Sequence, residues 1–309
     1  MKDHLLTFAV LILSGAVLTA GTPVSLEIAA RSGWRKSAEN HFAIQRTASS
    51  QGTSSLEFKA PLKPDTFYVI EWESRGTLID NDGQGQAILK LEKTVFPGFE
   101  VGKEWNSHRN YFYSGKATTG TFTIYLRKPG EQNLEIRNLK VLELSPDDYR
   151  NGFLFEFEDD NTLPGFWTRS WRQKKFAAAI VQSDFINGEK SMKLSSDGST
   201  EASITSGVFP VIAGARYRVS FWARGSANGS LLFVFNSNNQ RLSGNHPPIN
   251  LLRKHCAIET VWKEYSFDVT YPTDLGKYPT AAIPMANFVL TSKIPSVLLD
   301  HFKVERIRN

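Results

Sequence analysis

One stretch of this chain occurs twice, and the duplication constrains the fold more than any other feature. Residues 68–76 read YVIEWESRG and residues 217–225 read YRVSFWARG, with Tyr, an aliphatic residue, an aromatic residue, Arg and Gly at the same spacing. Both copies alternate apolar with other residues and end at Gly, which is typical of a strand with one buried face. This alternation predicts that Tyr217, Val219 and Phe221 face a core and that Trp222 and Arg224 face away from it.

Four further landmarks follow in both halves. They pair residues 52–58 with 188–194, Trp105 with Trp262, 122–124 with 288–290, and 136–141 with 299–304. Five matched landmarks indicate a duplicated domain. We expect the first domain at residues 22–145 and the second at 152–309, with a polar, turn-prone linker at 146–151 that contains Pro146, Asp147 and Asp148.

Short segments rich in aromatic and branched residues, bounded by Gly, Asn, Ser or Pro, run through both halves. Each copy holds seven to nine such segments by this interpretation, so the sequence predicts an all-β chain of two tandem antiparallel β-sandwiches. The pattern excludes Rossmann and α/β-barrel folds, because both need helices between strands.

The N-terminus is typical of a secretory signal peptide spanning residues 1–21. Lys2 precedes an apolar run over residues 5–18, and Thr19, Ala20 and Gly21 form a small-residue cleavage site. A membrane anchor is the alternative, but the run is shorter than the roughly 20 residues that cross a bilayer. No second apolar run follows. We therefore expect a secreted or periplasmic protein without a membrane span after cleavage.

Cys256 is the only cysteine, which excludes an intrachain disulfide and lipid attachment at a new N-terminal Cys. The net charge of +5 is spread out: residues 22–150 hold 17 basic and 16 acidic groups, and residues 151–309 hold 18 and 14. A nucleic-acid-binding protein is expected to concentrate basic residues on one element, so we expect no nucleic-acid partner.

Catalytic motifs are missing from the sequence. The six His residues are scattered, and neither a nucleophile elbow nor a phosphate-binding loop occurs. Carboxylates are numerous, but no sequence feature singles out a pair for glycoside hydrolysis. We therefore predict a protein that is not an enzyme.

The second repeat resembles carbohydrate-binding modules of the family 4, 9 and 22 kind, which are galactose-binding-like jelly rolls. The resemblance spans residues 152–307 and rests on an ordered set: Phe157-Glu158-Asp159, Leu163-Pro164-Gly165, Trp167, Gly188, Ser191, Leu194, Gly214, residues 217–225, Trp262, and Leu299-Asp300-x-Phe302-x-Val304. The first repeat matches more weakly and carries Arg137 where the second has Asp300.

The resemblance implies a structural calcium ion in the second domain. Glu158 and Asp300 match the positions of the early Glu and the last-strand Asp that help to bind calcium in such modules, together with backbone carbonyls near the Gly-x-x-Ser turn. Carboxylate and carbonyl oxygens are the ligands that calcium prefers. The alternative is that both carboxylates are solvated surface groups. Because Arg137 would bring a positive charge, we predict no calcium in the first domain.

Saccharides stack on aromatic rings and bond to planar polar groups, so candidate ligand-binding residues are of these types. We predict Trp222 and Arg224 on an outward face, Trp171 at a polar rim, and Asn236, Asn238 and Gln240 in a long polar segment over residues 236–255. The alternatives are that Trp222 is covered and that the amides serve turns. Trp167 and Trp262 resemble the family's structural tryptophans and are predicted to pack in the core.

Two classes of function follow. The first is an exported, non-catalytic protein that binds a polysaccharide or another glycan. The second is a structural or adhesive surface protein that uses the jelly rolls for protein contacts, for which Phe96 and Phe99 offer a contact surface or a surface for docking between domains. A glycan-active enzyme is a third and weaker alternative.

Overall fold

A computed structural model describes most of the chain: residues 21–30, 33–46, 54–78, 86–92, 94–96, 99–126, 131–158, 166–169, 177–199, 201–237, 249–273 and 285–308. The expected signal peptide lies outside these residues, apart from Gly21. In the part of the chain that is described, no helix is both long and apolar enough to span a membrane.

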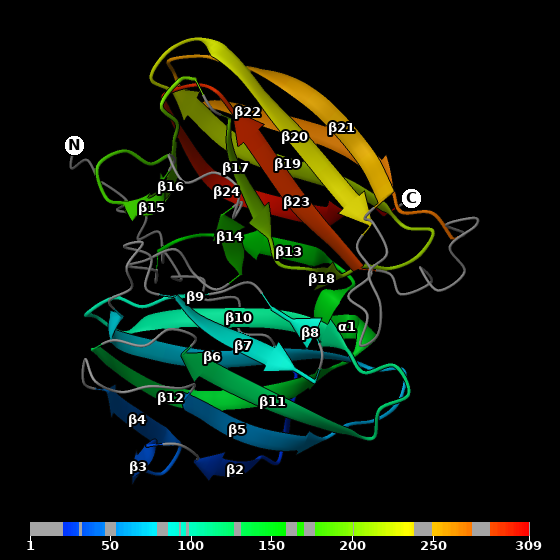
Figure 1. The fold of residues 1–309 in the computed structure, drawn as a ribbon. Coiled ribbons are helices and arrows are strands. Elements are labelled where there is room, and N and C mark those ends of the chain that lie inside the picture. Colours follow the sequence, from blue (N-terminus) through cyan, green and yellow to red (C-terminus); the bar gives the residue numbers. More distant parts are fainter. Residues whose placement is uncertain are drawn as a thin grey trace, which may run out of the picture.

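The first half of the chain forms two antiparallel sheets, seen in the lower part of Figure 1. We name each sheet by its central strand. The β12 sheet has the order β10 (Asn106–Tyr113), β6 (Phe67–Leu78), β12 (Gln132–Leu144), β4 (His41–Arg46), β3 (Arg35–Ala38), with β1 (Thr22–Val24) paired to β12. The β11 sheet has the order β2 (Glu27–Ala30), β5 (Ser54–Pro61), β11 (Thr119–Leu126), β7 (Gln86–Leu91), β8 (Thr94–Val95), with β9 (Phe99–Glu100) paired to β7.

The second half repeats this arrangement in the upper part of Figure 1. The β24 sheet has the order β15 (Ala177–Val181), β16 (Ser191–Ser195), β24 (Ser296–Arg306), β19 (Arg216–Gly225), β22 (Lys263–Thr270), with β13 (Gly152–Phe155) paired to β24. The β23 sheet has the order β14 (Trp167–Arg169), β17 (Ala202–Ser206), β23 (Met285–Ser292), β20 (Gly229–Ser237), β21 (Ile249–Ile258), with β18 (Phe209–Pro210) paired to β23. The all-β class with two tandem sandwiches is confirmed.

The strand orders match between the halves, and they support four of the five sequence landmarks. The paired motifs lie on β6 and β19, the Trp105 and Trp262 landmarks precede or begin the aligned strands β10 and β22, and the last two landmarks lie on β11 with β23 and β12 with β24. The match of residues 52–58 with 188–194 is wrong. The first segment leads into β5 of one sheet, whereas the second leads into β16, whose topological counterpart is β4 of the other sheet.

Two local features recur at equivalent places. Tyr68 accepts a hydrogen bond from the backbone N–H of Lys63 at 2.7 Å, and Tyr217 accepts one from Ile212 at 2.7 Å. Each last strand also has a residue in the left-handed region, Asn138 with φ 54° and His301 with φ 51°. A register shift against the neighbouring strand accompanies both, as a β-bulge does. In each domain the bulge directly follows residue 137 or 300.

Alternation sorts the side chains as expected. Tyr217, Val219 and Phe221 are fully buried between the sheets of the second domain. Trp167 is 2% exposed and packs against Phe302 with ring centroids 5.0 Å apart, so its predicted core position is confirmed.

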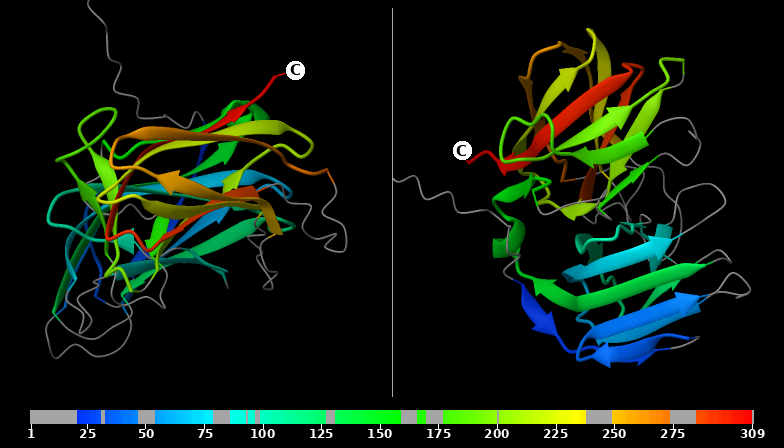
Figure 2. Two further views of the ribbon diagram at one scale, coloured as in Figure 1. Left: turned by 90° about the horizontal axis from the view of Figure 1, so that it is seen from above. Right: turned by 90° about the vertical axis from the view of Figure 1, so that its left-hand side faces the viewer.

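The two sandwiches share an apolar interface, and the segment expected as a linker contains the short helix α1 (Pro146–Tyr149). Tyr111 on β10 lies 5.3 Å from the ring of Phe153 and 6.2 Å from that of Phe166, and Phe67 lies 5.5 Å from Tyr149. The right-hand view of Figure 2 shows one sandwich above the other, with α1 at one side between them. The interface residues belong to the same apolar cluster as the second domain's core.

Candidate functional site

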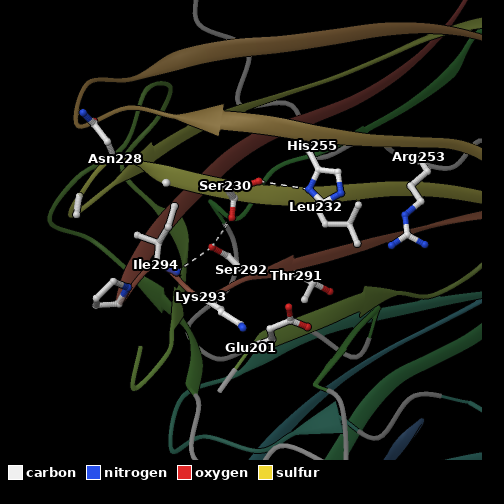
Figure 3. Close-up of a pocket in the computed structure, with 13 residues that line it drawn as sticks. Glu201, Asn228, Ser230, Leu232, Arg253, His255, Thr291, Ser292, Lys293 and Ile294 are labelled. Atoms are coloured by element: carbon white, nitrogen blue, oxygen red, sulfur yellow. Dashed lines mark hydrogen bonds between the residues drawn. The ribbon is translucent and has the colours of Figure 1, made fainter. Parts of the chain in front are cut away.

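The outer face of the β23 sheet is hollowed at the end where β20 begins. On β20, Leu231, Phe233 and Phe235 face the core, so Ser230 and Leu232 face outward. A pocket of about 520 Å³ lies over this face and is shown in Figure 3. Its polar lining comes from four strands or their ends: Glu201, Asn228, Ser230, Arg253, His255, Thr291, Ser292 and Lys293.

Strand pairing fixes the floor of the pocket. Leu232 lies opposite His255 on β21 and opposite Thr291 on β23. The Ser230 hydroxyl is 3.3 Å from His255 Nδ1, and the Thr291 hydroxyl donates to the Ser203 hydroxyl at 3.0 Å. One apolar side chain is thus surrounded by hydroxyl and imidazole groups that side-chain hydrogen bonds hold in place.

The rim of the pocket carries charges of both signs. Arg253 points into the hollow from β21, while Glu201 and Lys293 lie at its opposite side (Figure 3). Within the described residues, the structure gives none of these three side chains an ion pair. All three residues are exposed, and donors and acceptors of this kind are those that bind polar ligands. Among the described lining residues, none is aromatic.

The predicted ligand-binding residues lie elsewhere. Trp222 and Arg224 are half-buried on the outer face of β19, in the other sheet of the sandwich. Asn236 is in β20 and is 3% exposed, so its amide is not presented at the surface. Trp171, Asn238 and Gln240 lie outside the described residues.

The Arg224 guanidinium is held by a carboxylate. Its Nη1 donates to Asp184 at 2.5 Å, and Trp262 Nε1 donates to the other oxygen of Asp184 at 2.9 Å. Trp262 is half-buried, so the prediction that it packs in the core is wrong. Trp262 lies in the turn before β22, where its indole crosses the outer face of the sheet and reaches Asp184.

Phe96 and Phe99 form neither a contact surface nor a docking surface. They are 2% and 0% exposed inside the first domain's own core. Phe99 packs on Trp72 with ring centroids 5.1 Å apart, and Phe96 lies 6.4 Å from Phe112. The segment after β7 folds back over the open end of the sandwich and supplies both rings to the core.

Glu158 and Asp300 meet at one turn, residues 184–190. Glu158 accepts backbone N–H bonds from Glu189 at 2.7 Å and Lys190 at 3.2 Å. Asp300 accepts bonds from the backbones of Ile186 at 3.1 Å and His301 at 2.7 Å. Asp300 is 1% exposed, and this burial raises the pKa of its carboxyl.

This pair fits a calcium ion in part. A buried carboxylate beside a second carboxylate on the same turn supplies the hard oxygen ligands that calcium prefers. Among the described residues, however, no group of three or more His, Cys, Asp or Glu side chains is placed to hold a metal. Backbone carbonyl oxygens of the turn would have to complete the coordination.

In the first domain a guanidinium lies at the position of Asp300. Arg137 Nε donates to Glu73 at 2.5 Å, and its Cζ lies 3.9 Å from the centre of the Trp105 ring. Arg75 also lies over this ring, at 4.7 Å, and donates to Glu135 at 3.0 Å. Ion pairs and cation–π contacts thus surround the first-domain residue that is equivalent to Asp300.

The sequence analysis did not predict the pocket residues, because it applied the alternation of inward and outward side chains only to β19. The same reading of residues 229–237 places Ser230 and Leu232 outward, and β21 then contributes Arg253 and His255 by pairing. The signal was present in the sequence for β20, but the partner strand and its register were not.

The strand orders define the fold class: two tandem antiparallel β-sandwiches. No protein-family model matches the chain, and no curated protein matches it. Among solved structures it is similar to the CBM22-1–CBM22-2 tandem domain of Paenibacillus barcinonensis Xyn10C, at 13% identity over 95% of this chain and 100% of that one, with a TM-score of 0.40.

Single modules match part of the chain. The CBM22-1 xylan-binding domain of the same Paenibacillus enzyme is 12% identical over 52% of this chain and 97% of its own, with a TM-score of 0.36. The CBM22-1–GH10 modules of Clostridium thermocellum xylanase 10B, in complex with xylohexaose, are 15% identical over 46% of this chain and 26% of that one, with a TM-score of 0.33. Carbohydrate-binding modules of family 22 are thus among the solved structures to which this chain is similar.

Proposed function

We propose that this chain is an exported, non-catalytic carbohydrate-binding protein, and that its second domain holds a saccharide in the pocket on the outer face of the β23 sheet. One observation carries the proposal: Arg253, Lys293 and Glu201 surround a hollow floored by Leu232, with no ion pair among the described residues to occupy them. Sugar hydroxyls need donors and acceptors of this kind, and about 520 Å³ is in the usual range for a small-ligand pocket.

The pocket is a better site than the face around Trp222. Arg224 is already bonded to Asp184, so a ligand there would have to displace an ion pair. Arg253 has no such competitor among the described residues. The hypothesis that Trp222 stacks on a sugar ring stays a prediction, and the experiment below distinguishes the two faces.

Isothermal titration calorimetry with saccharides selected on a glycan array tests the proposal. Arg253→Ala is expected to weaken binding by about tenfold to a hundredfold, because a hydrogen bond to a charged group contributes about 1.5–3 kcal/mol. Lys254→Ala is the matched control: it removes the same charge from the next residue of β21, whose side chain faces the other way. Equal affinity of the Arg253→Ala variant and the parent would place the site elsewhere.

We also propose that calcium binds between Glu158, Asp300 and the carbonyl oxygens of residues 184–190, and that the first domain binds none. The buried Asp300 carboxylate supports the first part, and Arg137 at the equivalent position supports the second. The ion would tie the segment after β13 to β24. Its role here is structural.

The alternative function, a structural or adhesive surface protein, makes a different prediction for the same array. Under this alternative, no glycan class binds the mature protein, and the charged side chains of the pocket bind a protein partner instead. Loss of partner capture by Arg253→Ala, without any glycan binding, is the result that would favour this alternative.

A further inference from the structure

A second pocket, at the end of the second sandwich that lies next to α1, is lined by four arginines. It measures about 770 Å³. Arg150 follows α1, Arg216 begins β19, Arg306 ends β24 and Arg308 follows it. The other lining residues are Asn151, Gly214, Ala215, Thr270 and Ile307. No carboxylate is among these described lining residues.

Backbone hydrogen bonds hold the walls of this arginine pocket in place. The N–H of Arg306 donates to the Asn151 carbonyl at 3.1 Å, and the N–H of Ile307 donates to the Arg216 carbonyl at 2.9 Å. Gly214, in the left-handed region with φ +77°, turns the chain into β19 and donates to the Tyr271 carbonyl at 2.8 Å. Segments far apart in the sequence thus present their guanidinium groups to one hollow.

Carboxylates balance only part of the charge. Arg150 pairs with Asp147 at 2.9 Å, and Arg216 pairs with Asp268 at 2.8 Å. Asp268 is shared, because Arg218 also donates to it at 2.9 Å. The Arg308 guanidinium donates to the neutral amide oxygen of Asn151 at 2.8 Å.

Arg306 has no ion pair among the described residues. Arg306 and Arg308 together therefore leave two positive charges at the pocket that the described carboxylates do not neutralise.

We propose that the arginine pocket binds an oxyanion, and that this oxyanion is a carboxylate or sulfate group carried by an acidic polysaccharide. The guanidinium fork matches carboxylate and sulfate oxygens with two parallel hydrogen bonds, and it loses its hydration more readily than an ammonium group does. The identity of the carrier rests on the proposed glycan-binding function, whereas oxyanion recognition does not. The four groups surround one hollow instead of following a groove, which favours a single anionic group over the spaced phosphates of a nucleic acid.

The test uses the full mature chain and one polymer in two forms, polygalacturonate and its methyl ester, which share one backbone but present a carboxylate or a neutral ester on each sugar. We expect the parent to bind polygalacturonate at least tenfold more tightly at low salt, and inorganic sulfate to compete. Arg306→Gln with Arg308→Gln should abolish both the preference and sulfate binding. Arg35→Gln with Lys36→Gln is the matched control, because it removes the same charge at exposed positions of β3 in the first domain and should retain both.

Four results would overturn the proposal. The parent could bind the two polymers equally, or bind sulfate without any preference between the polymers. The preference could survive in the Arg306/Arg308 variant, or a single-stranded oligonucleotide could bind more tightly through the same arginines. Failure of the proposed function has a different signature. It would appear as unchanged binding of a neutral saccharide by Arg253→Ala, while sulfate binding and its loss in the Arg306/Arg308 variant remained as described.

Discussion

At the scale of single residues, His108 is a titratable group buried in the first domain. It is 3% exposed on β10, lies between Trp72 and Phe99 with ring centroids 5.1 and 4.7 Å away, and meets the Ser74 hydroxyl at 2.7 Å. Burial lowers the pKa of this imidazole to about 3. The native protein therefore holds His108 neutral, whereas the unfolded chain protonates it near pH 6.5.

We predict that this difference makes the free energy of unfolding depend on pH. Below about pH 6.5 the unfolded state binds one more proton at this site, so the contribution of His108 to stability falls by about 1.4 kcal/mol per pH unit until the folded-state pKa near 3 is reached. Urea unfolding at pH 7 and pH 5 measures the effect. In His108→Phe the loss between the two pH values should be smaller by about 2 kcal/mol. An identical loss in the parent and the variant would contradict the assignment.

Trp222 and Trp167 provide a second prediction at this scale. Trp167 is buried in the core, so Trp167→Ala should lower the free energy of unfolding by about 3–5 kcal/mol. Trp222 is half-buried at the surface, and Trp222→Ala should cost less. If Trp222 stacks on a sugar, its truncation weakens binding by roughly thirtyfold, as loss of a stacking aromatic does. If the ligand lies in the pocket over Leu232, calorimetry will show unchanged affinity.

At the scale of elements, the turn over residues 184–190 contacts both the predicted calcium ligands and the predicted Arg224 face, which the sequence analysis considered separately. Asp184 holds Arg224 and Trp262, while the backbone of the turn bonds to Glu158 and Asp300. Gly188, with φ +74°, packs so closely on the Glu158 carboxylate that a Cβ there would collide with it. The turn therefore depends on Gly for its conformation and on both carboxylates for its place.

This arrangement predicts the effect of calcium on stability. At a hundredfold excess of calcium over its dissociation constant, the free energy of unfolding of the full chain should rise by about 2.7 kcal/mol. A chelator should abolish this increase. Asp300→Asn destabilises the turn in either case, because it weakens an acceptor of backbone N–H groups. The informative measurement is that its melting curve no longer responds to calcium. A response that persists in Asp300→Asn, or none in the parent, would rule out the site.

The sequence alone predicted the strands, their inward faces and the duplicated order, because a period of two and the Gly at each strand end are local properties. It could not predict which strands pair. Arg253 and Leu232 meet only through the register of β20 with its neighbours. Trp262 was misplaced for a related reason: its position in the chain suggested a core residue, whereas its partner Asp184 lies 78 residues away. Half of the predicted ligand-binding residues lie outside the described chain.

At the scale of the whole molecule, aromatic side chains pack between the two sandwiches, so the domains are in contact and not only connected by a linker. Tyr111 and Phe67 of the first domain belong to the same apolar cluster as Phe153 and Phe166 of the second. A hydrophobic interface restrains the motion of neighbouring domains relative to each other, so we expect this one to couple their unfolding. The pocket over Leu232 and the arginine pocket are therefore carried on one body together with the first domain.

We predict one coupled unfolding transition by calorimetry. Tyr111→Ala should lower the free energy of unfolding by about 3 kcal/mol and should lower the melting temperature of both domains. Phe112→Ala is the matched control, because this neighbouring ring points into the first domain's own core. It should lower the temperature of the single transition without splitting it, whereas Tyr111→Ala, which weakens the interface, should split the transition into two. Two independent transitions in the parent would contradict the coupling.

The central claim is that a glycan binds on the outer face of the β23 sheet in the second domain. A titration of the isotope-labelled protein with a saccharide that it binds, followed by amide chemical shifts, tests this most directly. The account predicts that the largest shifts fall on Ser230, Leu232, His255 and Thr291. Shifts confined to Trp222 and Arg224 on the β24 sheet, or to the first domain, would contradict it.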